Sequence, residues 1–418
     1  MEMIFDGARV KKCVRAISSK SEAHRYLICA ALGDKKRRID CTDTNADIDA
    51  TAACLNALGA KVIRTCGGFE VEPIGKVSKN AALDCNESGS TLRFMLPLAA
   101  SLGADCSFIM RGRLSARPLS PLYEIMTDKG VSLSPMGQNP LVTRGYLPAG
   151  DYSIAANVSS QYISGLLFAL SVADGHSTLT LEGRIESAPY IDMTLDALSA
   201  FGAEISFSEA LCRFDIVGKS RLRSPDALKV GGDWSNAAFL LVAGAIGKRS
   251  VTLTDVDTKS RQGDKAILDI LAQMGAEVTL CDGNITVSPS SLHGIEVDAS
   301  QIPDLVPIIA TAASVAEGET RIFNASRLRL KESDRIESVC ATLSSLGADI
   351  CATDDGMVIR GKKILSGGEV DSFNDHRIAM SAAVASLACE GAVKIARFEA
   401  INKSYPSFLD AWETEALQ

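Results

Sequence analysis

The sequence predicts an α/β fold built from six copies of a unit of about 70 residues. Alanine-rich apolar stretches end in a glycine at intervals of 70 to 73 residues, and a second set of helix-like segments ends in glycines that are 71 to 73 residues apart. Self-similarity at a fixed period indicates a repeat architecture. The first series is Gly33, Gly103, Gly175, Gly247, Gly318 and Gly391, and the second is Gly59, Gly130, Gly202, Gly275 and Gly347.

The helices of the second series are amphipathic. Between Gly263 and Gly275 one stripe is apolar and the opposite stripe is polar, which predicts a helix that covers a sheet from the solvent side. The apolar stripe is Ile267, Ile270, Leu271 and Met274, and the polar stripe is Asp264, Lys265, Asp269 and Gln273. Most of the terminal glycines precede alanine and a β-branched residue, as in 58–62. This pattern predicts a left-handed helix cap that leads into a strand.

The helices of the first series, such as 236–247 and 378–391, are apolar nearly all round and should be buried. Ser, Thr, Asp or Asn precedes most of them, as expected for ordinary N-caps. Capping does not explain the cations and the amide in or near several first turns, where the helix dipole disfavours positive charge. We therefore expect anions to bind there. These residues are Lys20, Arg25, Arg93, Gln161 and Arg377.

Composition limits the classes of function. The chain has 418 residues, 46% of them hydrophobic, which is enough for two domains with large cores. A net charge of −8 argues against nucleic acid or an anionic membrane as a partner. The N-terminal residues lack the pattern of a signal peptide, and no apolar run reaches the ~18 residues of a membrane span. We expect a soluble cytoplasmic protein.

Metal and nucleotide motifs are also lacking. The twelve cysteines are scattered without a C-x-x-C pair, and we expect them to be small buried hydrophobes. The four histidines lack ligand spacing, so we predict no metal site. The sequence contains neither G-x-x-x-x-G-K-[ST] nor a G-x-G-x-x-G after a strand nor G-x-S-x-G. An anion must therefore be held by helix N-termini and scattered Lys and Arg residues.

Polar clusters recur at matching phases of the repeat. They are Lys20/Ser21/Arg25, Gly89 to Arg93, Arg111/Arg113/Arg117, Ser159/Ser160/Gln161, Ser187/Tyr190, Asp304, Arg327 to Arg335, Asp375/His376/Arg377 and Lys403. Taken together and in this order, these motifs resemble the 5-enolpyruvylshikimate-3-phosphate (EPSP) synthase family from Lys20 to Lys403. The resemblance implies the two-domain enolpyruvyl transferase fold, an α/β (α+β) architecture in which each domain has three βαβαββ repeats with buried helices.

The resemblance also implies domain boundaries. Residues 1–18 and 230–418 should form a discontinuous domain, residues 19–229 the N-terminal domain, and the active site should lie in the interdomain cleft. The tail from Phe408 to Leu417 should be the sixth outer helix.

The implied reaction moves the enolpyruvyl group of phosphoenolpyruvate to the 5-hydroxyl of 3-phosphoshikimate. It releases phosphate and needs no cofactor. The family belongs to the shikimate pathway, which leads to chorismate and the aromatic amino acids; its members are usually monomers and are the target of glyphosate. General acid and base groups together with fixed cations are sufficient for such chemistry.

The resemblance assigns roles to individual residues. The catalytic set is Asp304, as base at the 5-hydroxyl, with Glu332 and Lys20 as the pair of which one protonates the methylene carbon. The 3-phosphoshikimate set is Lys20, Ser21, Arg25, Ser159, Ser160, Gln161, Ser187, Tyr190, Asp304 and Lys331. The phosphoenolpyruvate set is Lys20, Gly89, Arg93, Arg117, Gln161, Arg335, His376, Arg377 and Lys403.

The chain departs from the family pattern in two places, because Glu87-Ser88-Gly89-Ser90 replaces Asn-Ala-Gly-Thr and Arg327 replaces an asparagine. Three alternatives remain open. UDP-N-acetylglucosamine enolpyruvyl transferase has the same fold, but it carries a functional cysteine where this chain has Gly112. An RNA phosphate cyclase would need nucleotide contacts that this acidic chain does not suggest. A non-catalytic ligand-binding repeat protein is the third alternative.

Overall fold

The computed structural model describes residues 1–218 and 221–413. The chain divides into two compact units. Ser18–Val230 form one, called here the N-terminal unit, and Met1–Ile17 with Gly231–Gln418 form the other, called here the C-terminal unit. The chain passes from one unit to the other at two places, after Ile17 and after Val230.

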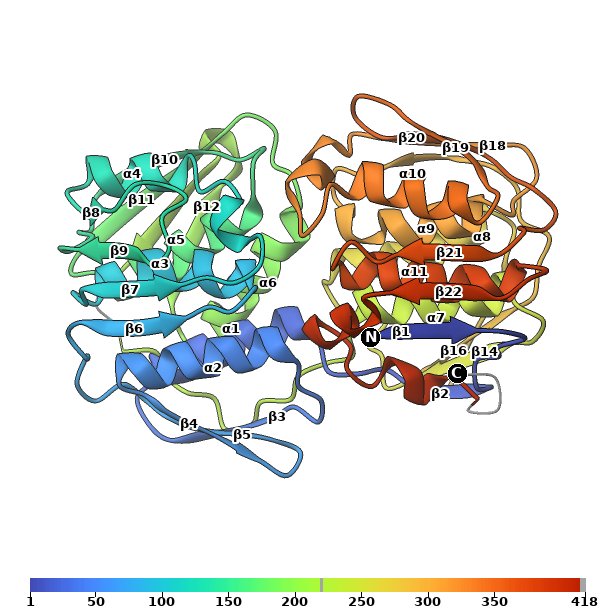
Figure 1. Cartoon of the computed structure of the whole chain (residues 1–418). Coiled ribbons are helices and arrows are strands. Elements are labelled where there is room, and N and C mark those ends of the chain that lie inside the picture. The colour runs from blue at the N-terminus through green and yellow to red at the C-terminus, as the bar shows by residue number, and fades with distance from the viewer. Residues whose placement is uncertain (219–220, 414–418) are drawn as a thin grey trace. The chain divides into compact units, whose positions relative to one another are not determined.

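Helices and strands alternate along the N-terminal unit (Figure 1). Its helices are α1 (Lys20–Ala31), α2 (Ala46–Leu58), α3 (Gly89–Ser101), η1 (Leu114–Ala116), α4 (Leu122–Asp128), α5 (Ser160–Val172), α6 (Ala188–Ala200) and η2 (Glu209–Leu211). Its strands are β3 (Arg37–Asp40), β4 (Lys61–Thr65), β5 (Gly68–Glu72), β6 (Ala81–Asp84), β7 (Cys106–Ile109), β8 (Ser132–Leu133), β9 (Leu141–Arg144), β10 (Asp151–Ala155), β11 (His176–Glu182), β12 (Glu204–Ser208) and β13 (Arg213–Val217).

The C-terminal unit repeats the same alternation. Its helices are α7 (Trp234–Ile246), η3 (Gly263–Ala266), α8 (Ile267–Gln273), η4 (Pro303–Leu305), α9 (Val306–Ala313), η5 (Ser326–Leu330), α10 (Arg335–Ser345), α11 (His376–Ala385), η6 (Ser386–Ala388), η7 (Phe398–Lys403) and η8 (Phe408–Ala411). Its strands are β1 (Glu2–Phe5), β2 (Cys13–Arg15), β14 (Val251–Thr254), β15 (Glu277–Cys281), β16 (Asn284–Ser288), β17 (Glu296–Asp298), β18 (Glu319–Phe323), β19 (Asp349–Ala352), β20 (Met357–Arg360), β21 (Gly368–Asp371) and β22 (Val393–Ala396).

The described strands form six small sheets, three in each unit. Four of them have four strands in one pattern, a parallel pair followed by an antiparallel hairpin, as in β10-β11-β13-β12. This is the topology of a βαβαββ repeat, since a parallel pair requires a crossover helix and a hairpin does not. The predicted fold class is confirmed.

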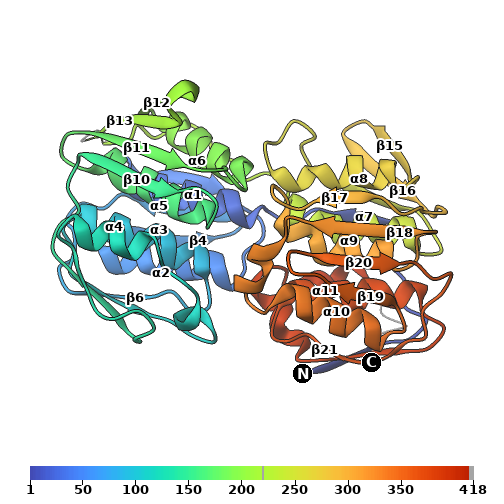
Figure 2. The same ribbon diagram turned by 90° about the horizontal axis from the view of Figure 1, so that it is seen from above.

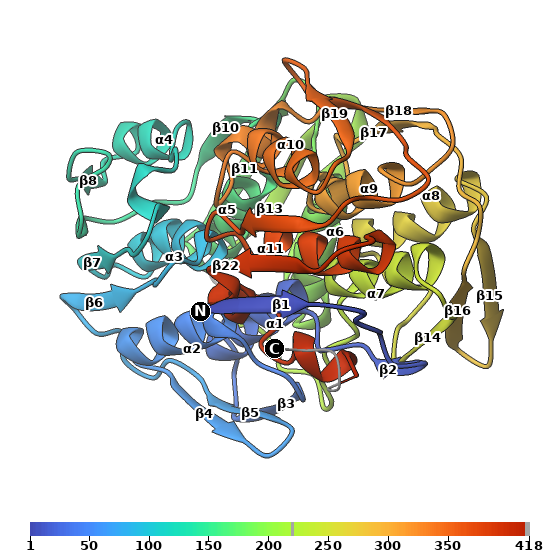
Figure 3. The ribbon, with the colours of Figure 1, turned by 45° about the vertical axis from the view of Figure 1, so that its right-hand side comes forward.

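The N-terminal strands lie in sheets of the C-terminal unit. Strand β1 pairs antiparallel with β22, so that Glu2 is opposite Ala396, and β2 pairs in parallel with β14. Figure 3 shows β1 beside β22. The first strand of the chain is therefore joined by backbone hydrogen bonds to residues 393–396.

The apolar helices are buried as predicted. In α3, α5, α7 and α11 nearly every residue is buried, and α7, α9 and α11 contact one another in pairs. Helices of the amphipathic series lie outside them, as α6 does beside β12 and β13 in Figure 2. The glycines that end this series have φ from +75° to +110°, so the predicted left-handed caps are confirmed.

The structure corrects three details. Asp264 was expected on the solvent-facing stripe but is 1% exposed, because it accepts a hydrogen bond from the hydroxyl of Ser235. Six cysteines are buried, whereas four lie exposed in turns or on the solvent side of strands, where no core covers them. The exposed ones are Cys13, Cys66, Cys281 and Cys351.

The tail from Phe408 to Leu417 is the third correction, because η8 ends at Ala411 and no outer helix continues through Glu413. Trp412 is extended, bridges to Val10 and is 1% exposed against the rings of Phe5 and Phe408. Burial of the indole in the core therefore overrides helix continuation. Residues 414–417 of the predicted helix lie outside the described residues.

A glycine at the contact between α3 and α5 provides a test of this packing. A methyl group built on Gly165 would overlap the backbone oxygen of Arg93. We predict that Gly165→Ala lowers the stability by about 1–3 kcal/mol, the usual cost of overpacking, measured as a lower midpoint of urea unfolding. Gly75→Ala is the matched control, because a methyl group there meets nothing within 4 Å and φ is not positive. Equal midpoints for the two variants would contradict the close helix contact.

Candidate active site

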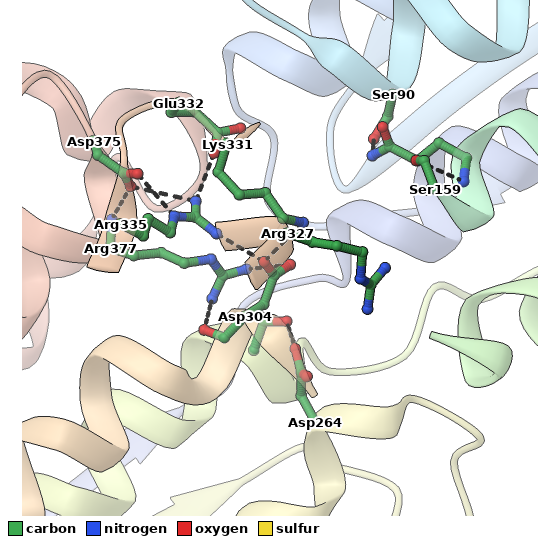
Figure 4. A network of polar contacts seen from close by, with 12 residues as sticks. Ser90, Ser159, Asp264, Asp304, Arg327, Lys331, Glu332, Arg335, Asp375 and Arg377 are labelled. Carbon is green, nitrogen blue, oxygen red and sulfur yellow. Dashed lines mark hydrogen bonds and ion pairs between the residues drawn. The ribbon is translucent and has the colours of Figure 1, made fainter. Parts of the chain in front are cut away.

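A buried guanidinium gathers three carboxylates in the C-terminal unit. Arg335 is the first residue of α10 and is 1% exposed. It donates through Nη1 to Asp304 (2.8 Å), through Nη2 to Glu332 (2.6 Å) and through Nε to Asp375 (2.8 Å). Figure 4 shows the three carboxylates converging on the guanidinium of Arg335. The arrangement uses the planar donor fork that distinguishes arginine from lysine.

Asp304 is held by further cations. Its carboxylate lies 3.1 Å from Arg377 Nη2 and 3.5 Å from Lys331 Nζ, and Arg377 also donates to its backbone oxygen. Burial tends to raise the pKa of Asp304, but Arg377, Lys331 and Arg335 outweigh it and hold the pKa well below its ordinary value. Asp304 is therefore an ionised carboxylate.

Lys331 has the opposite shift. Burial, together with the charges of Arg335 and Arg327, outweighs the attraction of Asp304 and lowers the pKa of Lys331 to about 8. Its ammonium group can thus lose a proton near neutral pH.

Helix α11 begins beside this network. Asp375 caps it by accepting from Arg377 N, while its second oxygen accepts from Arg335 and from Ser333. Lys403 Nζ donates to the backbone oxygen of Asn374, the residue before Asp375. His376 follows at the start of the helix and is buried.

One buried carboxylate near Asp304 was not among the expected site residues. Asp264 accepts a hydrogen bond from Ser235, as Figure 4 shows. Burial and the charge of Asp304 raise the pKa of Asp264 to about 6, against the opposing effect of Arg377. The network therefore contains one carboxylate that resists ionisation beside one that does not.

The N-terminal unit holds a second cluster of cations at helix starts. Lys20 opens α1 and donates to Asp47 on α2 at 3.0 Å. One turn on, Arg25 is 3% exposed and donates to Thr194 Oγ1 and to the backbone oxygens of Ser21 and Tyr190. Burial lowers the pKa of Arg25 to about 10, so its guanidinium remains charged at neutral pH.

Arginines from two segments meet at the start of α3. Arg93 Nη1 donates to Gln161 Oε1 at 2.6 Å, and Gln161 Nε2 donates to Ser90 at 2.9 Å. A methyl group built on Gly89 would lie 2.8 Å from Arg117 Nη1 and 3.0 Å from Arg93 Nη1. Glycine at position 89 thus allows both guanidinia to approach the backbone.

The expected site residues fall into these two clusters. Asp304, Lys331, Glu332, Arg335, His376, Arg377 and Lys403 lie in the C-terminal unit, and Lys20, Ser21, Arg25, Gly89, Arg93, Arg117, Ser159, Ser160, Gln161, Ser187 and Tyr190 lie in the N-terminal unit. Ser159 caps α5, and Ser187 precedes α6 with φ of 54°. Within its cluster, Lys20 contacts Asp47, which was not among the expected residues.

Sequence reasoning selected Asp304 and Glu332 but assigned no role to two further carboxylates that hold these cations. Asp375 was named only as an N-cap and within the Asp375/His376/Arg377 cluster, and Asp47 had no signal beyond its place in the first turn of α2. Within the described part of the chain, no group of three His, Cys, Asp or Glu side chains is arranged to hold a metal ion. No helix found in residues 1–218 or 221–413 is long and apolar enough to cross a membrane.

Fold and site together define a transferase of the enolpyruvyl type, and comparison with known proteins identifies the family. The family model described as EPSP synthase (3-phosphoshikimate 1-carboxyvinyltransferase) matches residues 4–412. The chain therefore belongs to the EPSP synthase family and is an enzyme of the 3-phosphoshikimate 1-carboxyvinyltransferase class, which acts in aromatic biosynthesis by the shikimate pathway.

Individual relatives agree with this assignment. The 3-phosphoshikimate 1-carboxyvinyltransferase of Clostridium novyi (strain NT) is 41% identical over 406 residues, 94% of this chain and 93% of that protein. The protein of the same name from Clostridium perfringens (strain ATCC 13124) is 41% identical and covers 99% of this chain and 97% of its own length.

Solved structures show the same fold. EPSP synthase from Acinetobacter baumannii has a TM-score of 0.82 at 25% identity and covers 100% of this chain and 99% of its own. The enolpyruvyl transferase NikO from Streptomyces tendae has a TM-score of 0.79 at 18% identity, covers 100% and 98%, and supports the fold alone.

The carboxylate cluster around Arg335 makes stability depend on pH. We predict that Arg335→Leu costs about 3–5 kcal/mol near pH 7.5, because Asp304, Glu332 and Asp375 lose the cation that compensates them. Wild-type Asp304, with its lowered pKa, stabilises the fold above its unfolded pKa of about 3.9 and loses that contribution at lower pH. In the variant Asp304 loses one of the cations that lower its pKa and takes up a proton more readily, so the deficit should shrink towards pH 5.

Urea unfolding at the two pH values measures this difference. Arg360→Leu is the control, because the pair of Arg360 with Glu319 is 65% and 50% exposed and its loss should change the midpoint little at either pH. A deficit for Arg335→Leu that grew as the pH fell would contradict the proposed compensation.

Proposed function

We propose that this enzyme transfers the enolpyruvyl group of phosphoenolpyruvate to the 5-hydroxyl of 3-phosphoshikimate and releases phosphate. The arrangement of Asp304 and Glu332 on one guanidinium carries the proposal. The reaction needs a base at a hydroxyl and an acid at a carbon, together with fixed cations for two anionic substrates. This cluster offers both carboxylates with Arg335, Arg377 and Lys331 around them.

The proposed addition step forms one bond between the 5-oxygen of the acceptor and C2 of phosphoenolpyruvate. Asp304 takes the proton of the hydroxyl, and Glu332 or Lys20 gives a proton to the methylene carbon, which becomes a methyl group. In the second step the C2–O bond to phosphate breaks, and the methyl group returns a proton as the double bond re-forms. Each candidate acid is held by an ion pair, Glu332 to Arg335 and Lys20 to Asp47, and Glu332 can act as the acid only after its carboxylate has taken up a proton.

The low pKa of Asp304 bears on when it acts as a base. A carboxylate whose pKa lies well below neutral pH accepts a proton poorly. General base catalysis is most efficient when the pKa of the base lies near the working pH. The carboxylate and phosphate of phosphoenolpyruvate would place negative charge beside Arg335 and Arg377. We propose that bound phosphoenolpyruvate offsets the positive charge of Arg335 and Arg377 and so raises the pKa of Asp304. This rise makes Asp304 an effective base.

We propose that both domains, residues 19–229 and residues 1–18 with 230–418, supply one active site in the interdomain cleft. For 3-phosphoshikimate we propose Lys20, Ser21, Arg25, Ser159, Ser160, Gln161, Ser187, Tyr190, Asp304 and Lys331. For phosphoenolpyruvate we propose Lys20, Gly89, Arg93, Arg117, Gln161, Arg335, His376, Arg377 and Lys403. Paired guanidinia suit the two anionic groups of the donor, and hydroxyls at a helix start suit a phosphate. We further propose that the enzyme works as a monomer in the cytoplasm.

The geometry at Gly112 argues against the alternative function, that of a UDP-N-acetylglucosamine enolpyruvyl transferase. A side chain there would overlap the carboxylate of Glu87, so a functional cysteine could be accommodated only if Glu87 moved. The Glu87 departure from the family pattern thus coincides with a glycine in the facing loop.

The acceptor can be identified directly. We predict that the purified enzyme releases phosphate from phosphoenolpyruvate with 3-phosphoshikimate and shows only background release with UDP-N-acetylglucosamine, in a coupled phosphate assay. Release with the nucleotide sugar alone would reverse the choice of acceptor.

The base can be tested by Asp304→Asn. We predict that turnover falls by a factor on the order of 10² to 10⁴, the usual range for loss of a general acid or base, while 3-phosphoshikimate still binds. The amide can accept a hydrogen bond but cannot take the proton. The exposed Asp349→Asn serves as the control and should keep full turnover. Wild-type turnover in Asp304→Asn would exclude this residue as the base.

A further inference from the structure

A chain of four buried polar side chains joins α1 to the start of α3. His24 Nδ1 lies 2.7 Å from Thr51 Oγ1, which lies 2.7 Å from Thr91 Oγ1, and Thr91 Oγ1 donates to Ser88 Oγ at 2.8 Å. None of the four is more than 1% exposed. They come from three helices, α1, α2 and α3, and from the residue that caps α3. No step of the proposed reaction uses them.

Counting hydrogens along the chain determines the state of the histidine. Each hydroxyl has a single hydrogen to donate. Thr91 gives its hydrogen to Ser88, so Thr51 must give its own to Thr91, and Thr51 then accepts from His24. Only an Nδ1–H group on His24 can supply that hydrogen.

The other ring nitrogen indicates that the histidine is neutral. His24 Nε2 is buried and has no hydrogen-bond partner in residues 1–218 and 221–413, and the ring meets Phe94 edge to face with centroids 6.3 Å apart. A charged imidazolium would leave a buried donor unsatisfied there. Burial, Lys20 and Arg25 also hold the pKa of His24 well below its ordinary value.

The other end of this hydrogen-bond chain lies next to residues that we assign to the phosphoenolpyruvate site. Ser88 caps α3 by accepting from Thr91 N, and Gly89 follows, with its α-carbon beside the guanidinia of Arg93 and Arg117. Thr91 Oγ1 also lies 3.4 Å from the backbone oxygen of Asp47, whose carboxylate holds Lys20.

We propose that His24, as the neutral Nδ1–H tautomer, acts through Thr51 and Thr91 as a positioning residue for the first turn of α3 and for Lys20. This inference rests on the proposed function, because it takes that turn to bind phosphoenolpyruvate and Lys20 to contact both substrates. The directed chain fixes the hydroxyl of Ser88 as an acceptor and so preorganises the cap.

The tautomer can be observed by NMR on protein with ¹⁵N-labelled histidine. We expect the His24 signals to show a protonated Nδ1 and an unprotonated Nε2 from about pH 6 to about pH 8, a range over which an ordinary histidine changes charge. His24→Asn removes those signals and so assigns them. A protonated Nε2, or titration of the ring within this range, would overturn the proposal.

Paired substitutions test the positioning role. Thr51→Val breaks the chain while keeping the shape of the side chain, and Thr51→Ser keeps the hydroxyl. We expect the KM for phosphoenolpyruvate to rise about 5- to 20-fold in Thr51→Val, as for loss of one buried hydrogen bond, and to stay within about twofold of wild type in Thr51→Ser. The KM for 3-phosphoshikimate should change less than that for phosphoenolpyruvate in both.

A second pair keeps the test informative if Thr51→Val fails to fold. Asparagine carries its amide nitrogen at the same position as His Nδ1, so His24→Asn should retain the donor, whereas His24→Leu should not. Equal KM values for phosphoenolpyruvate within each folded pair of variants would overturn the positioning role. Failure of the wild type to release phosphate when both substrates are present would instead reject the proposed function. The NMR result would still report on the hydrogen-bond chain from His24 to Ser88.

Discussion

The buried guanidinium of Arg335 is the constraint on which the C-terminal cluster depends. A charge removed from water is tolerated only where opposite charge and hydrogen bonds compensate it, and here Asp304, Glu332 and Asp375 do so together. Because Asp375 also caps α11, the same interaction fixes the start of that helix and with it Arg377. The orientation of two proposed catalytic carboxylates is thus determined before any substrate binds, which is the preorganisation that electrostatic catalysis requires.

Neutral groups help to orient two arginines of the N-terminal unit. Arg93 donates to the amide oxygen of Gln161, and Arg25 donates to the hydroxyl of Thr194 and to two backbone oxygens, whereas Lys20 pairs with the carboxylate of Asp47. In the C-terminal cluster the cations are already balanced by carboxylates, and there the carboxylates are the groups that can exchange protons.

The sequence by itself determined the repeat, its two kinds of helix and the places where cations gather. Glycines such as Gly59 and Gly347 marked helix ends because a left-handed cap is a local requirement of the backbone, and apolar periodicity separated buried from outer helices for an equally local reason. Motif order also sufficed to name the family, and residues such as Arg335 and Asp304 were selected before their contacts were known.

Glu332 and Arg335, three residues apart, are a pair that local spacing allows, but only the tertiary structure decided which groups far apart in the sequence pair. Asp375 lies 40 residues from Arg335 and Asp47 lies 27 from Lys20, so no local rule of helix or strand spacing could join them. The burial of Asp264 on an apparently solvent-facing stripe depended on Ser235, 29 residues away. Trp412 is extended rather than helical because its indole is buried in the core. Side-chain pairing across a fold is a property of packing in three dimensions, and the order of residues along the sequence does not specify it.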